Sequence, residues 1–183
     1  LDQVPALAAK AGLKVIHGIW LSSDRQLNRQ QIDTTVALAK EFPGVITSIV
    51  VGNEVLLRGE MTAIDLAGHI RAVKAQVTGI PVTYADVWEF WLKHREIYEA
   101  VDFITIHILP YCEGFPIRAR YAAAHVASIR KRVAVAFPAK EILIGETGWP
   151  SAGRMREGAL TDAHRPAVGP EHGAPRLQEK GAQ

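Results

Sequence analysis

Short runs of branched apolar residues alternate along the chain with longer segments whose apolar residues recur at helical spacing. The runs predict buried strands, because a strand that is covered on both faces carries apolar residues at consecutive positions. The predicted strands are 13–21, 45–54, 80–88, 102–111 and a run that opens at Glu141. The predicted helices are 3–11, 28–42, 63–77, 92–100 and 116–135. Alternation of this kind favours a parallel sheet with helices packed outside it.

Residues that start or stop helices support these boundaries. Thr62 is placed to cap the helix over 63–77, and Asp24 is a possible cap for the helix before it. Gly12 closes the first helix and Gly79 closes the third.

Two architectures fit the alternation, an open doubly wound sheet and a (β/α)8 barrel. An open nucleotide-binding sheet would carry a glycine-rich turn after its first strand, yet that turn reads Trp-Leu-Ser-Ser at 20–23, and no phosphate-binding loop occurs. All five strands end in polar or aromatic residues, as the strands of barrel enzymes do. These residues are Trp20, Ser22, Asn53, Glu54, Asp86, Trp88, His107, Tyr111, Glu146 and Trp149. The sequence therefore predicts an α/β fold built as part of a barrel.

The number of strands predicts an incomplete barrel. A full barrel has eight strands in about 250 residues, whereas this chain has 183 residues and no strand pattern after residue 149. Glycine, proline, alanine, histidine and arginine dominate the last stretch, which has little apolar surface to bury. We predict an incomplete barrel domain over 1–160 and a disordered or unrelated, irregular C-terminal tail over 161–183.

Composition narrows the class of partner. The net charge is only +2 and the basic residues are dispersed, which disfavours nucleic acid. A single cysteine, Cys112, excludes an internal disulfide and a cysteine metal site. No apolar run approaches the roughly 20 residues that span a bilayer. His17 and His107 lie within predicted strands without metal-ligand spacing, so we interpret both as interior histidines and expect no metal.

Glu54 and Glu146 end two predicted strands that two other strands separate. In a barrel this places the two carboxylates across one mouth, roughly facing each other. A carboxylate pair at one cleft is the machinery for cleaving glycosidic bonds, and the gap between them decides whether the second is a nucleophile or a base. Asn53, just before Glu54, is suited to bind a sugar hydroxyl without adding a negative charge.

The motifs Val-Gly-Asn-Glu at 51–54 and Gly-Glu-Thr-Gly-Trp-Pro-Ser at 145–151 resemble glycoside hydrolase family 17, whose bacterial members look closest. The resemblance covers about residues 1–160 and makes the five strands the third to seventh of a (β/α)8 barrel. It implies a retaining two-glutamate mechanism on β-1,3-linked glucan, by hydrolysis or by transfer to another sugar. Glu54 would be the acid/base and Glu146 the nucleophile, with no cofactor. The family suggests a cell-envelope, membrane-associated or secreted location.

Other strand-end residues are expected to contact the sugar. The resemblance matches Tyr111 to a tyrosine near the nucleophile, and we expect its hydroxyl to hydrogen-bond Glu146. His107 stands where plant members of the family carry asparagine, and is included among the substrate-binding candidates.

The aromatic rings of Trp20, Trp88 and Trp149 are candidate platforms for the flat face of a sugar, whereas Trp91 is expected to pack in the core. Asp86 would either bind a sugar hydroxyl or cap the next helix.

A second hypothesis is an inactive barrel fragment, at most a weak carbohydrate-binding remnant, because missing strands would leave two open sheet edges. A nucleotide-dependent oxidoreductase is disfavoured by the missing glycine motif. The sequence leaves open the choice between hydrolysis and transfer, and the oligomeric state.

Overall fold

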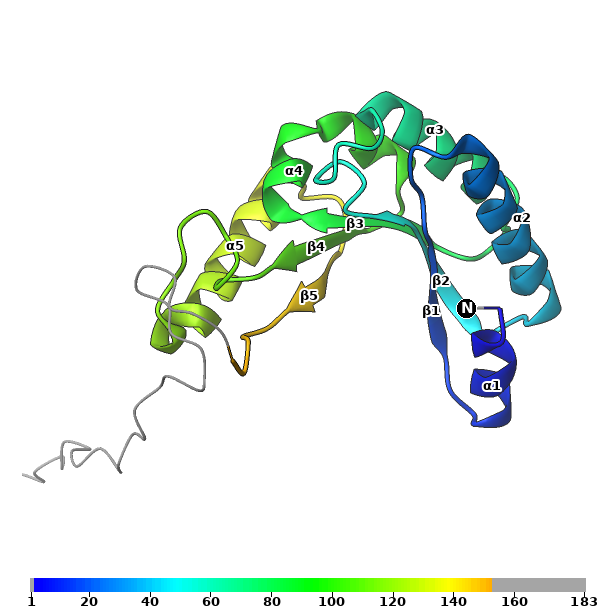
Figure 1. Ribbon diagram of the computed structural model, residues 1–183, viewed down its shortest axis with the longest axis horizontal. Helices are drawn as coiled ribbons and strands as arrows, with labels where there is room; N and C mark the ends of the chain where they lie inside the picture. The colour runs from blue at the N-terminus through cyan, green and yellow to red at the C-terminus, as the bar shows by residue number, and fades with distance from the viewer. Residues whose placement is uncertain (1, 153–183) are drawn as a thin grey trace, which may run out of the picture.

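A computed structural model describes residues 2–152, whose five strands form one parallel sheet that curls into part of a barrel (Figure 1). The strands are β1 (Val15–Ile19), β2 (Ile46–Asn53), β3 (Val82–Val87), β4 (Ile104–Ile108) and β5 (Ile142–Thr147). Their order across the sheet follows their order in the chain, and every neighbouring pair is parallel. All carboxyl ends therefore meet along one rim.

The helices lie along the convex side of the curled sheet, and the concave side is open (Figure 1). They are α1 (Val4–Lys10), α2 (Arg25–Glu41), α3 (Ala63–Lys74), α4 (Trp88–Lys93) and α5 (Ala122–Ala136), with 3₁₀ turns η1 (Arg95–Ala100) and η2 (Ala119–Tyr121). This confirms the predicted α/β fold, a partial barrel of parallel strands with outer helices.

Three of the four predicted helix-boundary residues are confirmed, whereas Gly79 does not close α3, which ends at Lys74 with Ala75 as its C-cap. The Asp24 carboxylate accepts from the backbone N–H groups of Gln26 and Leu27 at the start of α2. The Thr62 hydroxyl accepts from the N–H of Asp65 at the start of α3. Gly12 follows α1 with φ +67°, the left-handed conformation that ends helices.

Two predicted helices are placed differently in the structure. The segment predicted over 92–100 divides into α4 and η1, because His94 leaves helical geometry at φ −114° and ψ 69°. Trp88 is the first residue of α4, whereas the sequence predicted it as the last residue of a strand. The helix predicted over 116–135 begins only at Ala122, with no side-chain cap to mark its start.

Burial differs between the middle and the edges of the sheet. Nearly every residue of β3 and all of β4 are buried, because helices and neighbouring strands cover them. Leu66, Ile70 and Val73 of α3 are fully buried on the outer side of the sheet. In contrast, Ile16 of β1 and Leu143 of β5 are exposed and line the open concave face.

The predicted tail over 161–183 lies outside the described residues, so its disorder stays a prediction. Within the described part of the chain, no helix has both the length and the apolar character needed to cross a bilayer.

Candidate active site

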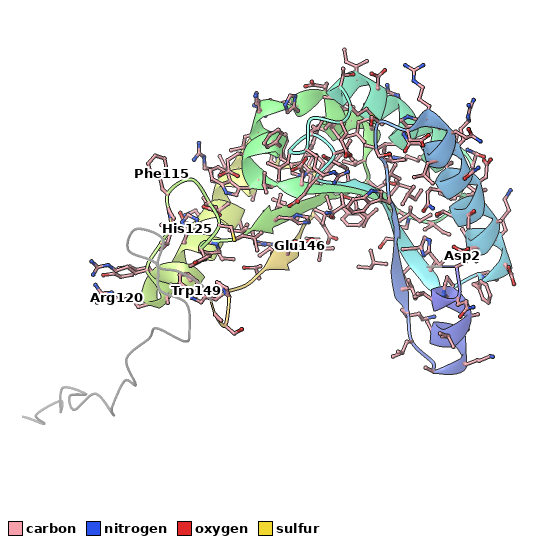
Figure 2. All side chains as sticks on the ribbon, viewed as in Figure 1. Asp2, Phe115, Arg120, His125, Glu146 and Trp149 are labelled. Carbon is pink, nitrogen blue, oxygen red and sulfur yellow. The ribbon has the colours of Figure 1, made fainter. Side chains whose placement is uncertain are left out.

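The two glutamates meet at the rim where the strands end. Glu54 directly follows β2, and Glu146 lies in β5. One carboxylate oxygen of each, together with a ring nitrogen of His107, lie within 4.8 Å of one another. Carboxyl groups about 5–5.5 Å apart suit a nucleophile and an acid, whereas wider pairs leave room for a water. Figure 2 shows Glu146 on β5, with Trp149 further along the chain.

Strained backbone presents Glu54 at the end of β2. Glu54 has φ +53°, and no other non-glycine residue in the described part of the chain has positive φ. Gly52 has φ +87°, and a Cβ there would lie 2.8 Å from Cγ2 of Val55. The register of β2 with β3 shifts between Val50 and Asn53. Strain of this kind persists only where the surroundings hold it, and it concentrates at functional sites.

A buried tyrosine supports the turn after Glu54. The Tyr84 hydroxyl accepts from the N–H of Leu56 at 3.0 Å and donates to the Asp86 carboxylate. Asp86 also accepts from the N–H of Val87 at 2.7 Å. Burial raises the pKa of Tyr84 far above its usual range, with a contribution from Asp86. Burial also raises the pKa of Asp86, although the Tyr84 hydrogen bond opposes that effect.

The placement of Asp86 does not support the predicted contact with sugar. Its side chain is 0% exposed, and both Tyr84 and Val87 hydrogen-bond its carboxylate. Asp86 does not cap α4 either, since that helix has no side-chain cap. Asp86 instead accepts a hydrogen bond from Tyr84, and Tyr84 in turn supports the turn after Glu54.

A bulge turns Glu146 toward the concave face. The register of β4 with β5 shifts between Ile106 and His107, so that Gly145 is an extra residue and His107 pairs with Glu146. Both Gly145 and Glu146 line the concave hollow, although strict alternation would point them to opposite faces.

His107 lies between the two glutamates. Its Nδ1 is 2.9 Å from Oε1 of Glu54, and its Nε2 is 3.7 Å from Oε1 of Glu146. The prediction of an interior histidine is confirmed, because His107 is only 1% exposed. A role in substrate binding stays a prediction.

Two hollows adjoin at this histidine. The first, of about 440 Å³, runs along the concave face and is lined by Trp20, Asn53 and Glu146 among others. The second, of about 450 Å³, is lined by Glu54 and extends to the loop after β4. Glu146 lines the first hollow, Glu54 lines the second and His107 lines both, so a ligand in either hollow would lie beside one of the two glutamates.

Arg58 connects Trp20 to the end of β2. Its guanidinium donates to the carbonyls of Asn53 and Leu21, pairs with Glu60 at 2.6 Å and lies 4.4 Å from the Trp20 ring centre. Trp20 remains 49% exposed and faces the first hollow. Asn53 lines the same hollow, as its predicted sugar contact requires. No sequence motif marks Arg58, because its bonds to Asn53 and Leu21 go to backbone carbonyls and its ring contact is with Trp20, far away in the chain.

The other aromatic candidates differ in their surroundings. Trp149 meets Tyr111 edge-on, with ring centres 5.6 Å apart, and the predicted bond from Tyr111 to Glu146 stays a prediction. Trp88 is half-buried, lies 5.0 Å from the Arg132 guanidinium and donates to Glu113, so it packs toward α5. Its sugar contact also stays a prediction.

Trp91 is 1% exposed and donates to the Thr105 carbonyl at 2.8 Å, which confirms that it packs in the core.

Glu54, His107 and Glu146 are also the residues, among 2–152, whose donor atoms could hold a metal ion. Two carboxylates and an imidazole would suit zinc. An ion there would occupy the same oxygens that sugar chemistry needs.

Paired carboxylates at the carboxyl ends of a curled parallel sheet, beside an open hollow with an exposed tryptophan, are the arrangement that glycoside hydrolases use. The sequence profile of the BtgE/BtgC glycoside hydrolase domain matches residues 1–167. The chain belongs to this family, within glycoside hydrolase family 17.

Two curated relatives are fungal. The probable β-glucosidase btgE of Aspergillus fumigatus is 29% identical over 173 residues, which cover 92% of this chain and 30% of that protein. A glucan 1,3-β-glucosidase of Arthroderma benhamiae is 29% identical over 167 residues, 85% of this chain and 53% of that protein. The chain thus spans about a third to a half of these relatives. The expected likeness to bacterial members is not supported, because the relatives found are fungal.

Solved structures agree with the family. The glycoside hydrolase family 17 β-1,3-glucanosyltransferase of Rhizomucor miehei has a TM-score of 0.78 and 27% identity, over 87% of this chain and 59% of that one. An active-site mutant of the Rhizomucor enzyme in complex with laminaritriose has a TM-score of 0.77.

Proposed function

We propose that this protein acts on β-1,3-linked glucan as a retaining glycoside hydrolase or transglycosylase. The observation that carries the proposal is the approach of the Glu54 and Glu146 oxygens to within 4.8 Å. That spacing suits double displacement, in which the second carboxylate attacks the sugar directly. The substrate class rests on the fungal β-1,3-glucosidase and on the Rhizomucor relative that was solved with laminaritriose.

Glu54 is assigned as the acid/base and Glu146 as the nucleophile. Glu54 donates its proton to the leaving oxygen while Glu146 forms a glycosyl ester with the sugar carbon. Glu54 then takes a proton from water or from a sugar hydroxyl, which attacks the ester and restores Glu146. The Glu54 side chain is 23% exposed and that of Glu146 is 51% exposed, so the proposed nucleophile is the more accessible of the two.

The test is turnover of laminari-oligosaccharides by the purified chain. Glu146→Ala should reduce turnover by more than about a thousandfold, because no ester can form. With an activated aryl glucoside, Glu54→Ala should leave the rate of the first step nearly unchanged, because an activated aryl group departs without receiving a proton. The anomer released first should be the β form. Retained turnover by Glu146→Ala, or release of the α anomer, would end the assignment.

A second candidate is binding of glucan without turnover. Ile16 and Leu143 are exposed on the concave face. Apolar side chains at such positions are covered in a closed barrel, so their exposure favours an open sheet that binds glucan without cleaving it. Calorimetric titration with laminaritriose separates the two candidates: heat of binding with no product would favour the second, and product formation the first.

A further inference from the structure

His107 contacts the two glutamates unequally. The 2.9 Å between its Nδ1 and Oε1 of Glu54 is a hydrogen bond. The 3.7 Å between its Nε2 and Oε1 of Glu146 is too long for one, so this nitrogen faces Glu146 without bonding it. The ring is almost fully buried, which fixes its orientation.

Gly145 leaves the space that the ring occupies. A Cβ at Gly145 would lie 3.1 Å from Nε2 and 3.2 Å from Cδ2 of His107, and 2.6 Å from Cγ2 of Thr105. The bulge that turns Glu146 toward the hollow is therefore made by a residue without a side chain, directly against the imidazole.

We propose that His107 is a positioning residue: its Nδ1–H holds Oε1 of Glu54, so that the acid/base is fixed opposite Glu146. This inference rests on the proposed function. Glu54 follows a backbone turn with φ +53°, and its carboxyl needs one orientation to reach a leaving oxygen. With Oε1 occupied by the imidazole donor, Oε2 is left to carry the proton that goes to the substrate. A misplacement of about 1 Å can reduce a rate by about a hundredfold.

A purely structural histidine is the competing explanation, and His17 provides the reference. His17 is also buried in a strand, β1, but it does not line the hollow that contains Glu146. His17→Asn is therefore the matched control for His107→Asn.

The first test needs no activity. Nitrogen NMR of the full chain with labelled histidine should show His107 as the Nδ1–H tautomer, with that proton protected from solvent exchange. Glu54→Ala should abolish the protection, whereas Glu146→Ala should retain it. An Nε2–H tautomer, or protection that is unchanged in Glu54→Ala, would overturn the inference.

The second test is kinetic. His107→Ala should lower kcat on laminari-oligosaccharides by about a hundredfold and change KM by less than about threefold. His107→Asn should recover most of the loss, because the asparagine amide places an N–H near the position of Nδ1. His17→Asn should leave kcat unchanged. Equal losses in the Ala and Asn variants, or full activity of His107→Ala, would contradict positioning.

The third test uses the space at Gly145. In a Thr105→Ser background, which removes the Cγ2 contact, the new methyl of Gly145→Ala presses on His107, which supplies the other two of the three nearest atoms. Gly145→Ala should lower kcat about tenfold when His107 is present. Its effect should be smaller in the His107→Asn protein, because that protein has no Nε2 to meet the new methyl group. Full additivity of the two substitutions would mean that Gly145 does not serve His107. If the wild-type chain cleaves no laminari-oligosaccharide, the proposed function fails, and the tautomer experiment still decides whether His107 holds Glu54.

Discussion

The two strand ends that carry the glutamates are supported very differently. Glu54 follows β2, which pairs with a strand on each side, and its turn is held by Tyr84 and Arg58. Glu146 lies in β5, which among the described residues pairs only with β4, and its side chain is about half exposed. The Glu54 end is thus fixed by several independent contacts. The Glu146 end depends on one neighbouring strand and on the bulge at Gly145.

The difference in support between the two strand ends fits the different role proposed for each glutamate. In the proposed reaction Glu54 must point in one direction toward the leaving oxygen, which fixed surroundings favour. Glu146 must be open to the sugar, which its exposure allows. Substitutions around Glu54 should therefore affect stability and activity together, whereas substitutions near Glu146 should affect activity with smaller changes in stability.

Gly52→Ala should have the largest effect on stability. Alanine at φ +87° is strained, and its Cβ would lie 2.8 Å from the buried Val55. We expect the free energy of unfolding to fall by about 3 kcal/mol, from backbone strain and overpacking together. Urea unfolding followed by circular dichroism measures the change.

Gly44→Ala is the matched control for that measurement. Gly44 also has positive φ, +75°, but nothing lies within 4 Å of a Cβ there. It should lose only about 1 kcal/mol, from backbone strain alone. Equal losses at Gly52 and Gly44 would mean that the packing beneath the Glu54 turn is loose.

The sequence predicted the framework of this site, because its determinants are local. Runs of apolar residues indicated strands, parallel alternation placed their carboxyl ends on one rim, and the two glutamates were expected to meet there. The supports could not be predicted in the same way. Gly145 matters because of His107, a residue of another strand, and Tyr84 matters because of the N–H of Leu56, which lies 28 positions away in the chain. Nothing local marks these partners.

The start of α4 shows the same limit. The apolar pattern of β3 continues through Val87 into Trp88, and no capping side chain interrupts it. Trp91 of α4 is buried and donates to the Thr105 carbonyl of β4, a contact with another strand that no local pattern marks.

Tyr84→Phe tests the support beneath Glu54 without changing its shape. It removes the acceptor for the N–H of Leu56 and the donor to Asp86, both of them buried. Leaving such groups unpaired costs about 1–3 kcal/mol, so we expect a loss of about 2 kcal/mol and a lower kcat. Tyr121→Phe, at an exposed ring, should change stability by less than about 0.5 kcal/mol. Unchanged kcat in Tyr84→Phe would separate the turn from catalysis.

The Trp20→Ala variant tests whether the Trp20 ring, which Arg58 holds at the end of β2, contacts the ligand. Arg58 holds this exposed ring over the end of β2, facing the hollow. Loss of the ring should weaken laminaritriose binding about tenfold, or about 1.4 kcal/mol, with little change in stability. Calorimetric titration measures the affinity. Phe115→Ala is the control, since Phe115 is exposed on the loop after β4 and lines neither hollow (Figure 2). Equal affinities of the two variants would remove Trp20 from the binding surface.

The smallest effect concerns His17, the strand histidine away from the glutamates. Burial lowers the pKa of His17 below its ordinary value of 6.5. Below pH 6.5 the unfolded chain therefore takes up a proton that the folded chain refuses, and stability falls as the pH falls, by at most about 1.4 kcal/mol per pH unit. His17→Gln should flatten the decline in unfolding free energy between pH 7 and pH 5. An unchanged slope would show that His17 is hydrated in the folded chain, and it would then no longer serve as the buried reference for His107.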